Sequence, residues 1–340
     1  MKTSLILSVF LIFSASIFAQ PQIHNSFALD SILTLAMTSS VNRDSVNWEK
    51  LKPQIYALHK EEGIIAAGKL ILKELKDFHG RIWVNNVPYN GLSKPWKTST
   101  MVFDSLILDQ YRRTAIPVLG QVIKEEFGYI RIPGLIMGPA DSLYAWQIRQ
   151  TILDIQQKNK PKGWIIDLRL NGGGTMYPML AGLCDFYGDT KVGAFAEKSS
   201  GYNENWIIKD QNLYIDDRQM TDYQLSKMDN YLQLDTVPVV VLISAATSSS
   251  GEITAISFKN RPKTFFIGEE TSGYTTTVTW QPITENIVIQ LTISFYADRL
   301  GNIYEGDSVI PDEYVEGGDN FYDLEKDVKI LRAVEWLKRN

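Results

Sequence analysis

The sequence has very little cysteine and histidine, and no concentrated positive charge. Its one cysteine, Cys184, excludes an intramolecular disulfide and lies among apolar residues, as a buried small side chain would. The three histidines stand at none of the spacings that metal sites use, so we expect no metal ion. The formal net charge is −5 and no cluster of lysine and arginine is present, which argues against nucleic acid as a partner.

Apolar runs long enough to cross a membrane are also missing. The longest run, Ser4 to Phe18, is shorter than the roughly 20 residues that a helical span requires. It follows Lys2 and precedes Ala19, which is the pattern of a secretory signal peptide. We therefore predict a signal peptide over residues 1–19 and an exported protein, periplasmic or secreted, with no stable membrane span after cleavage. An uncleaved N-terminal anchor is the alternative.

What the chain does contain is an alternation of helix-like and strand-like segments. Apolar and small residues recur at helical spacing from Ile64 to Leu75, so residues 20–85 are interpreted as a helical N-terminal subdomain. Residues 86–125 form a connecting segment that is too short for an inserted peptide-binding domain. From 126 to 340 short apolar strands alternate with amphipathic helices, which is typical of α/β layers.

Individual elements of this α/β part can be assigned from the pattern. We expect residues 188–232 to be polar and rich in loops. The expected strands are 129–132, 163–169, 239–243, 265–268 and 287–293, and the expected helices are 141–158, 177–186 and 324–337, with a further helix after residue 249.

The most informative segment runs from Val239 to Ala255, where a buried-type strand passes through a hydroxyl-rich turn into a helix start. The first N–H groups of a helix have no intrahelical partner and carry partial positive charge, so a serine there has an oxyanion site beside it. This predicts Ser249 as a nucleophile. The same residues fit a capping box, with Ser249 as N-cap and Glu252 reaching back, so a purely structural role is the alternative.

A glycine run follows another expected strand, in Asp167-Leu-Arg-Leu-Asn-Gly-Gly-Gly174. Glycines there permit sharp turning and close approach of a ligand to outward-facing N–H groups. The run lacks the Gly-Lys-Ser/Thr ending of a P-loop and the G-x-G-x-x-G spacing of a dinucleotide fold, which disfavours nucleotide binding. A tight strand-to-helix connection is the structural alternative.

Five motifs taken in order resemble the tail-specific, or carboxy-terminal processing, peptidases and the related tricorn protease core. The resemblance covers residues ~45 to 337 and implies a crotonase/Clp-like α/β core of mixed sheet and helices, a serine-type peptidase activity and no cofactor. The motifs are Leu75–His79, Asp167–Gly174, Ser249–Glu252, Gly268–Gly273 and Tyr304–Asp312.

The resemblance also implies roles for individual residues. Ser249 is the implied nucleophile, with the Ser250 N–H as one oxyanion donor and Gly173 or Gly174 as the second. Members with a Ser–Lys dyad carry a lysine directly after Thr-x-Gly, but this chain has Tyr274, and a phenol with a pKa near 10 is a poor base.

The tricorn-like branch instead uses a histidine on the N-terminal side, and His79 stands at that position. Glu305 is the first candidate for orienting this imidazole, with Glu252 and Asp77 behind it. The bridging serine of tricorn has no counterpart beside His79. Thr271 and Tyr274 are expected to line the substrate groove or to have structural roles.

The function predicted from these residues is an exported serine endopeptidase, or processing peptidase, that acylates Ser249 with His79 as general base. Its partner would be an extended or unfolded polypeptide captured by strand addition. A catalytically inactive ligand- or peptide-binding protein on the same scaffold is the alternative. An acyl-CoA enzyme of the crotonase type would use similar glycines but is disfavoured by the export signal.

Overall fold

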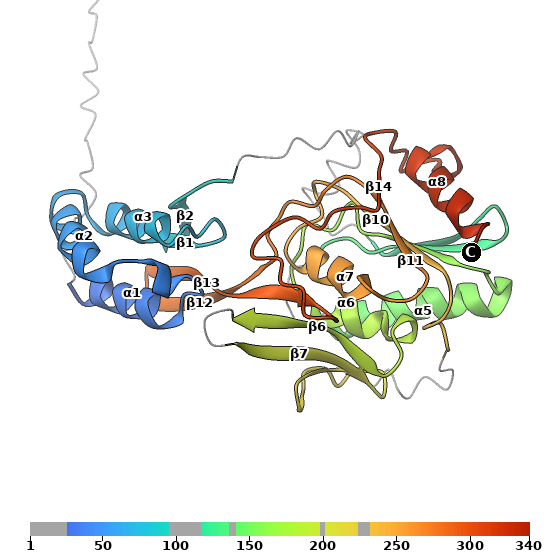
Figure 1. Cartoon of the computed structure of the whole chain (residues 1–340), viewed down its shortest axis with the longest axis horizontal. Coiled ribbons are helices and arrows are strands. Elements are labelled where there is room, and N and C mark those ends of the chain that lie inside the picture. The colour runs from blue at the N-terminus through green and yellow to red at the C-terminus, as the bar shows by residue number, and fades with distance from the viewer. Residues whose placement is uncertain (1–25, 95–116, 136–140, 198–200, 224–231) are drawn as a thin grey trace, which may run out of the picture.

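The structure is a computed structural model that describes residues 26–94, 117–135, 141–197, 201–223 and 232–340 (Figure 1). The expected signal peptide lies outside these residues. None of the described helices is both long and apolar enough to cross a membrane.

The N-terminal part is helical, as expected. Its helices are α1 (Ser26–Ser39), α2 (Trp48–Glu62) and α3 (Ile64–Glu74), with a short 3-10 turn over Arg43–Ser45. The sequence pattern had not indicated α1. The apolar faces of the three helices bury Leu29, Ile55 and Ile71 against Ile82 and Ile289, which belong to strands of the larger sheet.

That larger sheet has eight strands and connects the two parts of the molecule. Its order is β2-β1-β13-β6-β7-β8-β9, and β12 pairs with β13 off this path. One end of β13 pairs with β1 and the other end pairs with β6, so the β12–β13 hairpin runs from the helical part into the core (Figure 1). The strands are β1 (Arg81–Val84), β2 (Val87–Asn90), β6 (Thr190–Glu197), β7 (Tyr202–Lys209), β8 (Asn212–Ile215), β9 (Arg218–Gln219), β12 (Thr276–Thr284) and β13 (Ile287–Asp298).

The second sheet has six strands in the order β14-β11-β10-β5-β4-β3, and every pair except β3–β4 is parallel. The mixed α/β fold that we expected is confirmed. Its strands are β3 (Leu119–Ile123), β4 (Phe127–Arg131), β5 (Trp164–Asp167), β10 (Val239–Ile243), β11 (Thr264–Gly268) and β14 (Glu313–Tyr314), and its helices are α5 (Asp141–Asn159), α6 (Tyr177–Gly182), α7 (Ser250–Phe258) and α8 (Val328–Leu337).

Helices cover both faces of this sheet, and β10 shows why its sequence is apolar throughout. Val239 and Val241 join the cluster formed with α5, α6 and α7, whereas Val240 packs with α8 on the opposite face. A parallel strand buried on both faces has no polar side, so the usual alternation disappears. The carboxyl ends of β5 and β10 lie side by side, and both lead into the predicted site.

Three expectations about elements were wrong. Residues 188–232 are not mainly loop, because they contain β6 to β9. The strands β6, β7 and β8 each bury apolar side chains, such as Val192 on β6 and Trp206 on β7, but their polar residues masked the pattern, and both residues of β9 are polar and exposed. The helix expected over 177–186 ends at Gly182 and continues as a 3-10 turn, and the closing helix starts only at Val328, where Asp327 caps it.

Candidate active site

Ser249 stands on a sharp turn between β10 and α7. Its backbone has φ +51° and ψ −117°, in a region that residues other than glycine rarely adopt, so the surrounding turn must hold it there. The turn is fixed to the end of β5 by two hydroxyls. Ser244 donates to the carbonyl of Arg169 and Thr247 donates to that of Leu168, each at 2.9 Å.

The glycine run packs directly against this turn. Gly173 has φ +102°, and a Cβ placed there would lie 2.9 Å from the Cβ of Ser249, so only glycine allows this approach. The Gly173 N–H donates to Asn171 Oδ1 at 3.1 Å. Among the described residues, the N–H groups of Gly174 and Ser250 have no hydrogen-bond partner in the fold, so these two donors remain available beside Ser249.

Glu252 connects the Ser249 turn to the segment after β11. Its fully buried carboxylate accepts from the backbone N–H groups of Ser249, Gly273 and Tyr274, each at 2.8 Å, and from the hydroxyl of Thr271. Burial raises the pKa of Glu252 to about 7, although these hydrogen bonds act in the opposite direction. The predicted bond from Glu252 back to Ser249 is confirmed, and the same carboxylate also holds Tyr274.

His79 follows α3 and is positioned by two contacts. Its backbone N–H donates to Asp77 Oδ1 at 3.1 Å, and its ring Nδ1 lies 2.8 Å from the Thr276 hydroxyl on β12. With Nδ1 engaged, Nε2 is the other ring nitrogen that can donate or accept a proton. Asp77 holds the backbone and Glu252 holds the Ser249 turn, so neither is the partner of the ring, contrary to the secondary expectation.

The imidazole is neutral over most of the pH range. Burial lowers the pKa of His79 to about 4, and the charges of Arg81 and Lys94 act in the same direction. The ring of Tyr274 meets the imidazole edge-on, with 4.9 Å between ring centroids. Tyr274 therefore touches the histidine with its side chain and the Glu252 carboxylate with its backbone.

His79 and Glu305 line one cavity of about 310 Å³, together with Phe78, Lys94 and Tyr274. The ammonium of Lys94 donates to the carbonyls of Gly273 and Gly306, so a lysine does enter the site, but from the segment after β2.

Sequence reasoning missed both Thr276 and Lys94. The run of three threonines at 275–277 was a visible signal, yet nothing in the sequence tells which hydroxyl meets the histidine. Lys94 lies in a segment that the pattern left unassigned.

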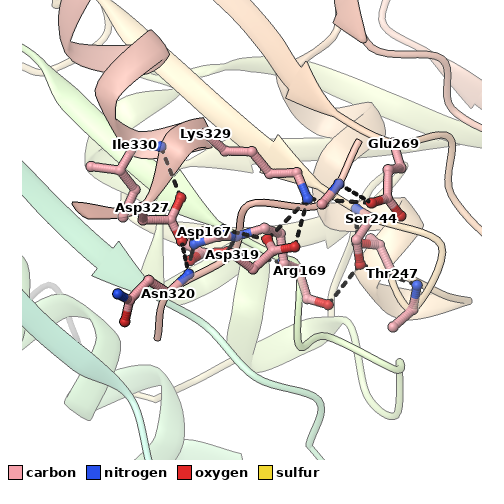
Figure 2. Close-up of polar contacts among 12 residues, drawn as sticks. Asp167, Arg169, Ser244, Thr247, Glu269, Asp319, Asn320, Asp327, Lys329 and Ile330 are labelled. Carbon is pink, nitrogen blue, oxygen red and sulfur yellow. Dashed lines mark hydrogen bonds and ion pairs between the residues drawn. The ribbon is translucent and has the colours of Figure 1, made fainter. Parts of the chain in front are cut away.

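A buried ion network surrounds Arg169, which precedes the glycine run in the sequence (Figure 2). The Arg169 guanidinium donates to Asp167, Asp319 and Asp327 at 2.6 to 2.8 Å. Lys329 pairs with Asp319 at 2.8 Å and with Glu269 at 3.3 Å. The Asp-Leu-Arg motif thus joins the end of β5 to the C-terminal segment, and through the Arg169 carbonyl it reaches the Ser249 turn.

The sequence pattern of peptidase family S41 matches residues 126–315, which is more than half of the chain and includes both the glycine run and the Ser249 turn. The chain belongs to peptidase family S41. This family assignment agrees with the resemblance drawn from the five motifs.

Individual relatives are more distant. The chain is 30% identical over 181 residues to the nisin-resistance protein of Lactococcus lactis subsp. lactis, covering 53% of this chain and 51% of that protein. It is 26% identical over 197 residues to a carboxy-terminal-processing protease of Bartonella bacilliformis, covering 57% and 40%. The matches therefore span about half or less of these relatives.

Among solved structures, a lipoprotein from Streptococcus agalactiae has a similar fold over almost the whole described chain. The TM-score is 0.66 at 19% identity, and the match covers 92% of this chain and 95% of that one. Because this match covers 92% of the chain, the likeness extends beyond residues 126–315, which the family pattern matches.

Proposed function

We propose that this S41 family member is an exported serine endopeptidase that cleaves extended or unfolded polypeptides through an acyl-enzyme on Ser249, with His79 as general base. The observation that carries the proposal is the bridging role of Glu252. Its carboxylate binds the backbone of Ser249 and the backbone of Tyr274, whose ring contacts His79. Nucleophile and base thus belong to one connected set of contacts.

In the proposed reaction the Ser249 hydroxyl attacks the substrate carbonyl and His79 Nε2 accepts its proton. The N–H groups of Ser250 and Gly174 bind the resulting oxyanion, since the N–H of Gly173 is engaged by Asn171. Nε2 then returns the proton to the leaving amine, which leaves an ester on Ser249 for water to hydrolyse. Thr276 fixes the ring through Nδ1, and we assign Glu305 to stabilising the imidazolium from the shared cavity.

An extended substrate fits the edge of the larger sheet. Within the described sheet, β12 pairs only with β13, so its other edge presents backbone donors and acceptors. This edge begins at Thr276, beside His79. A polypeptide that adds to it as a strand would pass the histidine. The similarity to a protein named carboxy-terminal-processing protease supports a polypeptide substrate.

A fluorophosphonate probe, which reacts with activated serines, tests the proposal. Wild-type protein should be labelled, and Ser249→Ala should abolish labelling. His79→Ala should slow it by about 10²–10⁴-fold, which is the usual contribution of a general base. Ser45→Ala, at a serine in the N-terminal helical part, is the matched control and should react as the wild type does. A folded wild-type protein that resists the probe would contradict the proposal and favour a binding protein.

A further inference from the structure

A second cavity lies on the other side of β12 from His79. Adjacent side chains of a strand point to opposite faces, and Thr276 directs its hydroxyl to the histidine. Thr277 therefore points away from it and lines a separate cavity of about 280 Å³. The Thr277 hydroxyl is buried and faces the phenol of Tyr296 on β13.

Tyr296 on β13 links this cavity to Ser249. The side chains of Ser249 and Thr277 both lie next to the phenol of Tyr296 on β13. The Tyr296 ring packs on Phe195, with 6.1 Å between centroids, and Phe195 lines the cavity. Tyr177, three residues after Gly174, lines it as well. The Tyr296 side chain thus lies between the cavity and the Ser249 hydroxyl.

The cavity combines apolar walls with the charged side chains of Glu197, Glu204 and Arg218. Phe195, Ile215 and Ile293 supply apolar walls, and the cavity volume is sufficient for a leucine or phenylalanine side chain. Of the two lining carboxylates, Glu197 forms an ion pair with Arg43.

The other carboxylate, Glu204, shares the cavity with Arg218, and their opposite charges both act on the Tyr177 phenol. With one charge of each sign left, a charged ligand group would find no net attraction that offsets its desolvation.

We infer that this cavity receives the side chain of the substrate residue whose carbonyl carbon Ser249 attacks, and that it selects a large uncharged apolar side chain such as leucine, methionine or phenylalanine. The inference rests on the proposed role of Ser249. It adds the specificity of the cleavage, which the proposed function leaves open.

Peptidyl diphenyl phosphonates that differ only at the reacting residue test the inference. Wild-type protein should react with the leucine probe about 10–200 times faster than with the alanine probe, which is the range for small differences in apolar contact. The lysine probe should react more slowly than the leucine probe.

The fluorophosphonate carries no such side chain and reports on Ser249 alone. Labelling by fluorophosphonate without any preference for leucine over alanine overturns the pocket and leaves the peptidase proposal standing. Absence of fluorophosphonate labelling overturns the peptidase proposal, and the pocket with it.

Reversing the charge of the exposed side chain Arg218 provides a second test. Arg218→Glu places a carboxylate beside Glu204, so the ratio of the lysine to the leucine rate should rise by about tenfold. Lys209→Glu makes the same charge change at an exposed position on β7 and should leave the ratio as it is in the wild type. Equal ratios in the two variants would show that the lysine side chain does not enter this cavity, and would overturn the inference.

Discussion

His79 is the residue whose surroundings bear most directly on the chemistry. Its burial, with Arg81 and Lys94 nearby, lowers its pKa to about 4, so the imidazole stays unprotonated and able to accept a proton far below its usual range. The unfolded chain protonates this side chain nearer pH 6.5. The contribution of His79 to stability is therefore complete above that pH and is lost as the pH falls toward about 4.

The pH dependence of fluorophosphonate labelling should show this shift. In protein kept folded, the acid limb should have its midpoint near the pKa of about 4, and Arg81→Gln should move the midpoint upward because one positive charge is removed. Lys50→Gln, on the exposed surface of α2, is the control for a distant charge. A wild-type midpoint at the ordinary imidazole value would show that His79 is not the group that titrates.

In the proposed reaction Thr276 is a positioning residue, because its hydroxyl contacts His79 Nδ1. Thr276→Val keeps the shape and removes the hydrogen bond, so labelling should slow by about 10–100-fold, by analogy with groups that orient a ligating or reacting histidine. Thr276→Ser should restore most of the rate. Thr279→Val, on the same strand, should match the wild type, and an equal loss in both valine variants would point to damage to β12 instead.

At the scale of elements, Glu252 joins the start of α7 to the segment that carries Tyr274. Three backbone N–H groups and one hydroxyl converge on one buried carboxylate. The pKa of this group is raised to about 7, so its contribution to stability is full below about 4.5 and declines as the pH rises through 7. This pH trend is opposite to that of His79.

Glu252→Ala should lower the free energy of unfolding by at least about 3 kcal/mol, since each buried donor left without a partner costs about 1–3 kcal/mol. Urea denaturation measures the change. Glu285→Ala, at the exposed turn between β12 and β13, should stay within about 0.5 kcal/mol of the wild type. A loss below about 1 kcal/mol for Glu252→Ala would mean that water or nearby groups satisfy these donors.

At the scale of the whole molecule, the C-terminal segment is held to the core by ions. Lys329 and Arg169 share Asp319, and all three side chains are fully buried (Figure 2). Burial acts to raise the pKa of Asp167, but Arg169 outweighs it and the pKa is lowered, so this carboxylate stays ionised. The network therefore combines strong attraction with a large cost of desolvation.

Removing one charged side chain of this network leaves its partners buried without a compensating charge. Lys329→Met should destabilise the protein by about 3–5 kcal/mol, because Asp319 and Glu269 would lose a buried cation. Lys326→Met, at an exposed ion pair with Asp323 three residues away, should change the free energy of unfolding by about 1 kcal/mol or less. Similar losses in both variants, measured by urea denaturation, would argue against the role of the buried network.

The sequence by itself determined those features that depend only on residues close together in the chain. The apolar run of β10 leading to a helix start, the glycines that permit close approach and the Glu252 cap all follow from short stretches of chain, and these identified Ser249 and its oxyanion donors as candidates. The same reasoning failed for β6, β7 and β8, in which buried apolar residues stand among polar ones, and for β9, which consists of two exposed polar residues.

Only the tertiary structure decided which distant residues meet. The contact of Thr276 with His79 spans 197 positions, and that of Arg169 with Asp327 spans 158. Neither leaves a signature in the sequence, because a threonine that orients a histidine has the same local pattern as any strand threonine. The first contact depends on how the β12–β13 hairpin joins the two parts of the molecule, and the second depends on how the segment before α8 packs at the end of β5. Packing of the complete chain fixes both.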